Sequence, residues 1–202
     1  MKRGITYILT FCGALLAAVY LHELGHAVAG WVQGVAVLPT PAKEYILRPQ
    51  LEWSKETWIA LGGPTGSAVA IFVAGLYFWR KPCLNREAVL LGALLVPGVY
   101  TLRFLLTGRG HDGTEWQAAQ TALGLRPAGH AIDVFFLLLV IAGLIVWGVR
   151  LRPSLWSPLR LIALAVVGTV LLVELQFANN AVFDRVLHDA SVMNVPAGLD
   201  PR

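Results

Sequence analysis

Residues 5 to 31 read ITYILTFCGALLAAVYLHELGHAVAGW. The run from Ile5 to Trp31 is apolar for most of its length, and its ionisable side chains gather near its end, in the segment LHELGH. A helix of about 20 apolar residues crosses the hydrocarbon core of a bilayer, which is about 30 Å thick. The segment is therefore predicted to be a membrane-spanning helix that carries a polar cluster.

The whole chain has the composition of an integral membrane protein. Of its 202 residues, 56% are hydrophobic and 14% are charged, and its mean hydropathy is +0.64. The charged share is about half of that in an ordinary soluble domain, which is about 25%. A soluble domain of this size could not bury so much apolar surface. We therefore expect an integral membrane protein in contact with the lipid bilayer, and we assign it to the cell (plasma) membrane.

Four further apolar runs follow the first, so the predicted fold class is an all-α membrane protein with about five transmembrane helices. Tryptophans lie near several ends of these runs, as in an interfacial aromatic belt. We expect one polytopic membrane domain over residues 1–178 and a polar C-terminal tail over residues 179–202. The predicted spans are about Ile5–Trp31, Trp58–Trp79, Ala88–Leu106, Ile132–Val149 and Leu159–Phe177.

The connection between the first two spans contains two short apolar runs, Val35–Leu38 and Tyr45–Leu47, with Pro39 and Pro41 between them. This pattern is typical of a short β-hairpin. It is equally compatible with an ordinary loop on the membrane interface, and both interpretations stay open.

The net charge of +4 does not indicate a nucleic-acid partner. The basic residues are distributed over both ends of the predicted spans, where they suit anchoring at the membrane interface. We therefore expect no nucleic acid among the partners.

The polar cluster of the first span contains the pattern HExxH in His22-Glu23-Leu24-Gly25-His26. Histidines four residues apart lie on one helix face, about 6 Å from each other by helical rise. That separation allows both imidazoles to bind one zinc ion, with Glu23 beside them as a general base for a metal-bound water. A solvated helix end is the other interpretation, but three ionisable side chains inside a span favour a functional site.

Catalytic zinc usually has three protein ligands, so a further ligand is expected from elsewhere in the chain. Asp112 lies in the glycine-rich stretch Gly108–Gly113, which can turn tightly. Asp112 could bind the metal or cap a following helix, and its position alone leaves both roles open. The candidates for this ligand are His111, Asp112, Glu115, His130, Asp133, Glu174 and His188.

HExxH in the first span with a distant Asp112-Gly113 pair resembles the site-2 proteases, which are intramembrane zinc metalloproteases. The resemblance is to compact members without a PDZ domain, and it implies that Asp112 is the third zinc ligand. His111 stands where the family has an apolar residue, so it is a competing ligand, a hydrogen-bond partner near the metal or a solvated histidine of the loop.

The stretch Gly62–Ser67 resembles the Gly-Pro segment that many of these proteases carry near the start of their second span. Ser67 stands where they have an asparagine, and the resemblance implies a contact between Ser67 and substrate or the metal site. Close packing of helices through small residues is the other interpretation of this stretch.

The resemblance implies an enzyme that hydrolyses peptide bonds of membrane proteins, with zinc (Zn²⁺) as its metal and no organic cofactor. The expected partner is a membrane-protein substrate in an extended conformation, which could add as a strand to the segment Val35–Leu47. Two alternatives remain. One is a scaffold that retains the fold without proteolysis. The other is a different metalloenzyme such as a di-iron oxygenase, which needs more histidines than the five of this chain.

Overall fold

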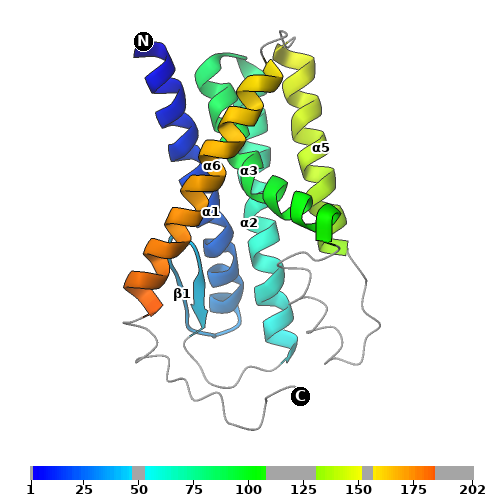
Figure 1. Ribbon diagram of the computed structural model, residues 1–202. Coiled ribbons are helices and arrows are strands. Elements are labelled where there is room, and N and C mark those ends of the chain that lie inside the picture. Colours follow the sequence, from blue (N-terminus) through cyan, green and yellow to red (C-terminus); the bar gives the residue numbers. More distant parts are fainter. Residues whose placement is uncertain (1, 47–52, 108–130, 152–156, 185–202) are drawn as a thin grey trace.

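The structure is a computed structural model that describes residues 2–46, 53–107, 131–151 and 157–184 (Figure 1). Within these residues, five helices are long and apolar enough to cross a membrane, which confirms the predicted fold class. Successive helices run in opposite directions through the bundle (Figure 1). The five are α1 (Lys2–Val32), α2 (Trp53–Arg80), α3 (Leu84–Thr107), α5 (Ala131–Leu151) and α6 (Ser157–Asn179).

The helices extend beyond both ends of every predicted span. An apolar run marks only the part of a helix that lies in hydrocarbon, whereas its backbone hydrogen bonds continue into the interface. α6 passes directly into a π-helical turn, η1 (Asn180–Asp184). Helical structure therefore continues past the predicted start of the tail at residue 179, and residues 185–202 lie outside the described part of the chain.

α1 is the helix around which the bundle is built. Its Phe11 and Leu15 are almost fully buried among residues of the neighbouring helices. α3 approaches α1 closely at Gly92, because a Cβ atom added there would lie only 2.8 Å from the Phe11 carbonyl oxygen. Large apolar side chains elsewhere on the helices are exposed, as expected for surfaces that face lipid. The bundle therefore packs large apolar side chains inside, approaches closely at glycines such as Gly92, and presents apolar outer faces to the membrane.

A two-stranded antiparallel hairpin joins α1 to α2, so the hairpin prediction is confirmed. It consists of β1 (Val37–Pro39) and β2 (Glu44–Ile46), with Val37 opposite Ile46 and Pro39 opposite Glu44. Pro39, which follows the first apolar run, is the last residue of β1. Proline is tolerated at a strand position whose backbone nitrogen points away from the partner strand, because no N–H is needed for pairing there.

The hairpin is fixed against the C-terminal half of α1 (Figure 1). Trp31 Nε1 donates a hydrogen bond to the Val37 carbonyl at 2.7 Å, and Val37 packs in a small core with Ala27 and Ile59. Gly34, with φ of 71°, supplies the left-handed turn that reverses the chain after α1. The hairpin therefore has a defined position relative to the HExxH segment.

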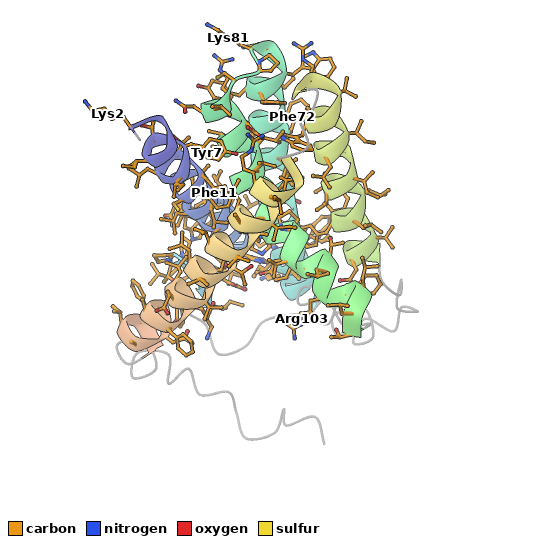
Figure 2. All side chains as sticks on the ribbon, turned by 45° about the horizontal axis from the view of Figure 1, so that its top comes forward. Lys2, Tyr7, Phe11, Phe72, Lys81 and Arg103 are labelled. Atoms are coloured by element: carbon orange, nitrogen blue, oxygen red, sulfur yellow. The ribbon has the colours of Figure 1, made fainter. Side chains whose placement is uncertain are left out.

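A buried polar cluster joins three helices near the opposite end of the bundle. The Glu87 side chain of α3 is fully buried, and its Oε1 accepts hydrogen bonds from Arg160 Nη2 of α6 at 2.7 Å and from Trp147 Nε1 of α5 at 2.9 Å. Lys2 and Lys81 lie at this end, whereas Arg103 lies at the other (Figure 2). The cluster is thus separate from the histidine pair, which lies nearer the hairpin.

Candidate metal centre

His22 and His26 form a closely spaced pair on α1. Each is only 2% exposed, and their Nε2 atoms are 3.3 Å apart. Two nitrogen ligands of a tetrahedral zinc ion, each bound at about 2.0–2.1 Å, lie about 3.3–3.4 Å apart. The ring centroids are 4.9 Å apart, closer than the helical rise alone suggests, because the rings turn toward each other. The pair has the spacing that one metal ion requires.

α2 orients both imidazoles through their Nδ1 atoms. The His26 Nδ1 lies 2.7 Å from the Ile59 carbonyl oxygen, and the His22 Nδ1 lies 2.9 Å from Ser67 Oγ. The Gly63 N–H also lies 3.3 Å from the His26 Nδ1. A carbonyl can only accept, so the shorter contact places the proton on the His26 Nδ1 and leaves Nε2 as the ligand atom. Metal-binding histidines are typically held in this way.

Glycines of α2 allow this close approach to α1. The stretch from Gly62 to Ser67 lies inside a continuous helix, and a Cβ atom on Gly62 or Gly66 would overlap the α1 backbone. A Cβ atom on Gly63 would overlap the Nε2 atoms of both histidines. The small residues therefore pack the two helices together and also leave space at the ligand atoms.

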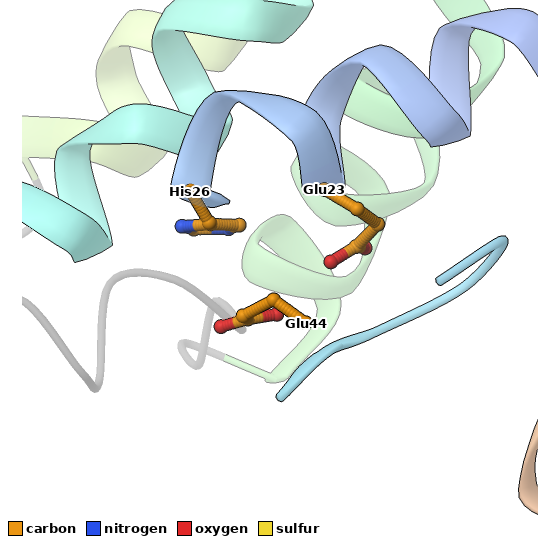
Figure 3. Close-up of side chains that lie close together, drawn as sticks. All are labelled: Glu23, His26 and Glu44. Carbon is orange, nitrogen blue, oxygen red and sulfur yellow. The ribbon is translucent and has the colours of Figure 1, made fainter. Parts of the chain in front are cut away.

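Two carboxylates, Glu23 and Glu44, lie close to His26 (Figure 3). Glu23 comes from α1 and is 6% exposed, whereas Glu44 comes from β2 of the hairpin and is half-buried. A carboxylate oxygen of each and a ring nitrogen of His26 all lie within 4.8 Å of one another. The site thus brings imidazole nitrogens and carboxylate oxygens together, which is a donor set that zinc accepts.

The site opens into a cavity of about 690 Å³ between α1, the hairpin, α3 and α6. His22, Glu23, His26 and Glu44 all line it. Its wall is otherwise mixed, with apolar side chains and the polar groups of Lys43, Arg103, Gln176 and Asn180. A cavity with these polar groups can hold water within a bundle that lipid otherwise surrounds.

The remaining predicted site residues fall into two groups. Ser67 is described, and it contacts His22 as given above. Asp133 is buried on α5, and Glu174 is exposed on α6 and is not among the residues that line the cavity. The others lie outside the described residues, so their predicted roles stay predictions. They are His111, Asp112, Glu115, His130 and His188.

Glu44 is the site residue that sequence reasoning missed. It belongs to no metal-binding spacing and is 18 residues from His26, with the turn at Gly34 between them. The fold brings it to the site, because the hairpin turns back against α1. The signal available in the sequence was a single acidic residue beside the short apolar run Tyr45–Leu47, which would place a carboxylate on a strand next to the HExxH helix.

Comparisons of the chain with protein-family models, with curated proteins and with solved structures find no match. The fold and the site alone define the class of protein. It is a helical membrane protein in which a buried histidine pair and two carboxylates face a partly polar cavity.

Proposed function

We propose that this protein is an intramembrane zinc metalloprotease that hydrolyses peptide bonds of membrane-protein substrates. The observation that carries the proposal is the 3.3 Å separation of the His22 and His26 Nε2 atoms. Both histidines belong to α1, a helix that is long and apolar enough to span a membrane. The family resemblance supports the same reaction and is part of the proposal, as is location in the cell membrane.

His22 and His26 would hold the zinc ion, and Asp112 stays the predicted third ligand. A zinc ion there would supply a Lewis acid for the scissile carbonyl and lower the pKa of a bound water. The orientation of the imidazoles by Ile59 and Ser67 supports this assignment, because it directs both Nε2 atoms to one place.

Glu23 is the general base in this proposal. It is adjacent to His22 in sequence, lines the same cavity and is nearly buried. Its carboxylate would accept a proton from the attacking water and pass that proton to the leaving amine. The largely buried position favours this transfer, since little solvent competes for the proton.

The outer edge of β2 is the proposed binding place for an extended substrate. The Thr40 N–H donates to the Lys43 carbonyl at 2.9 Å, which makes these two residues a hydrogen-bonded pair. Paired positions alternate along antiparallel strands, so the backbone N–H and C=O of Glu44 point to the outer edge. A substrate strand could pair there, beside the histidines.

Cleavage of a membrane-protein substrate by purified protein tests the proposal. Glu23→Gln should abolish cleavage and leave zinc bound, because the carboxylate moves a proton and does not hold the metal. Glu174→Gln, the same change at an exposed position on α6, is the control and should retain cleavage. Equal cleavage by Glu23→Gln and wild type would contradict the mechanism. A wild type that binds zinc but cleaves nothing would favour the scaffold.

A further inference from the structure

We propose that Glu44 is a metal ligand, which the hairpin supplies to the ion held by His22 and His26. This inference rests on the proposed metal centre but goes beyond it, because it adds a ligand from outside the HExxH helix. Three features of the site carry it. They are the fixed position of the hairpin, the distances among the donor atoms and the charge of the site.

The hairpin holds Glu44 in place from both sides. On the α1 side, the bond from Trp31 to Val37 fixes β1, and the register places Glu44 opposite Pro39. In β2, the side chain of the neighbouring Tyr45 is only 8% exposed, so this strand is packed against the protein through Tyr45. Successive side chains of a strand point to opposite faces, so burial of Tyr45 directs Glu44 to the cavity.

The donor distances suit coordination after small side-chain rotations. A carboxylate oxygen of Glu44 lies within 4.8 Å of a ring nitrogen of His26 and of a carboxylate oxygen of Glu23. Two ligands of one zinc ion, each bound at about 2.0–2.2 Å, can be no more than about 4.4 Å apart. The donor atoms of Glu23, His26 and Glu44 therefore lie near the separation that one zinc ion requires. His22 is not part of this group of three and joins it through its Nε2 atom, 3.3 Å from that of His26.

The charge of the site favours a bound cation. Carboxylate oxygens from two different elements lie within 4.8 Å of each other and of a ring nitrogen of the buried His26, and two charged carboxylates at this separation repel each other. Lys43 and Arg103 line the same cavity and contribute positive charge to it. A divalent ion between the donors would compensate the charge directly.

With His22 and His26, Glu44 would complete a set of two imidazoles and one carboxylate, and it would take the third ligand position that the resemblance predicts for Asp112. The same donor set binds catalytic zinc in other hydrolases, where an open position remains for water. Glu23 is then left for proton transfer. The backbone of Glu44 also lies at the edge of β2 where a substrate strand is proposed to pair. One residue would therefore contact both the metal and the substrate.

Zinc affinity of the purified full chain, measured by competition with a chromogenic chelator, tests the inference. Glu44→Gln keeps the size of the side chain and should raise the zinc Kd at least about tenfold, since even loss of a residue that only supports a ligand costs about 10–100-fold. Glu174→Gln should leave the Kd unchanged. A wild-type Kd in Glu44→Gln would overturn the inference.

Glu44→Asp separates coordination from simple charge balance. It keeps the negative charge but shortens the side chain, so a ligand role predicts a changed absorption spectrum of the Co²⁺-substituted protein. A charge-balancing role predicts a wild-type spectrum and wild-type affinity in this variant, and that result would overturn the inference. The spectrum of Glu44→Asp also decides the question if Glu44→Gln does not fold.

His22→Ala distinguishes this inference from the proposed metal centre. Loss of zinc in His22→Ala together with a wild-type Kd in Glu44→Gln would reject only the role of Glu44. Undiminished zinc binding by His22→Ala would reject the metal centre itself, and with it the ligand role of Glu44.

Discussion

At the scale of single residues, the site depends on a glycine, which has no side chain, as much as on its polar side chains. Gly63 faces the Nε2 atoms of His22 and His26, and any Cβ atom there would overlap both. Glycine costs a helix up to about 1 kcal/mol relative to alanine. The glycine therefore weakens α2 slightly and leaves the space that a metal ion needs.

Gly63→Ala should raise the zinc Kd at least about tenfold, by analogy with other changes next to metal ligands. Gly75→Ala is the matched control, because a Cβ atom there meets nothing within 4 Å on the same helix. The zinc Kd of both variants, purified in parallel, measures the effect. If Gly63→Ala retains the wild-type Kd, the metal does not lie at the Nε2 atoms.

The residues of the site differ in how far sequence predicted them. His22, Glu23 and His26 were found because helical spacing alone brings them together. Glu44 was missed because its approach depends on the path of the hairpin after Gly34. Ser67 was predicted as a contact near the site, and its bond to the His22 Nδ1 is consistent with that expectation.

At the scale of elements, the hairpin was harder to predict than the helices. Each strand has only three residues, too few for a clear alternating pattern, whereas each helix repeats its apolar signal over several turns. The hairpin takes its position from tertiary contacts, above all the bond between Trp31 and Val37. Such contacts leave no local signal in the sequence.

Trp31→Phe should loosen the hairpin and leave the bundle folded. The substitution removes the hydrogen bond from the Trp31 indole to the Val37 carbonyl, and a hydrogen bond of this kind contributes about 1 kcal/mol to stability. Amide hydrogen exchange in residues 35–46 should therefore become about fivefold faster. Cleavage should fall as well, because the substrate edge is less ordered. Trp58→Phe, at a tryptophan that is 62% exposed, is the control. Unchanged exchange in Trp31→Phe would show that other contacts fix the hairpin.

At the scale of the whole molecule, the bundle has the proposed metal centre near one end and a buried ion pair near the other. Glu87 and Arg160 are 73 residues apart in sequence, so no local pattern predicts their pairing. Sequence suggested only that Arg160 anchors a span end. In the structure, its guanidinium joins α6 to α3 through the fully buried Glu87.

Arg160→Met should destabilise the bundle by about 3 kcal/mol, at the lower end for a broken buried pair, because it leaves the Glu87 carboxylate without its cation. The Arg160 side chain is 32% exposed, which reduces the effect. Arg150→Met, at an exposed arginine that donates a hydrogen bond to the Trp79 carbonyl, should destabilise the bundle much less. Thermal unfolding in detergent compares the stabilities of the two variants. Equal losses of stability would contradict a structural role of the ion pair between Glu87 and Arg160.

The metal content of the purified chain decides whether the proposed centre exists. We expect one zinc ion per chain in the wild type, retained in Glu23→Gln and lost in His22→Ala, because the imidazoles hold the metal and the carboxylate of Glu23 moves a proton. Two iron ions per chain, or zinc that persists undiminished in His22→Ala, would contradict a zinc protease built on this histidine pair.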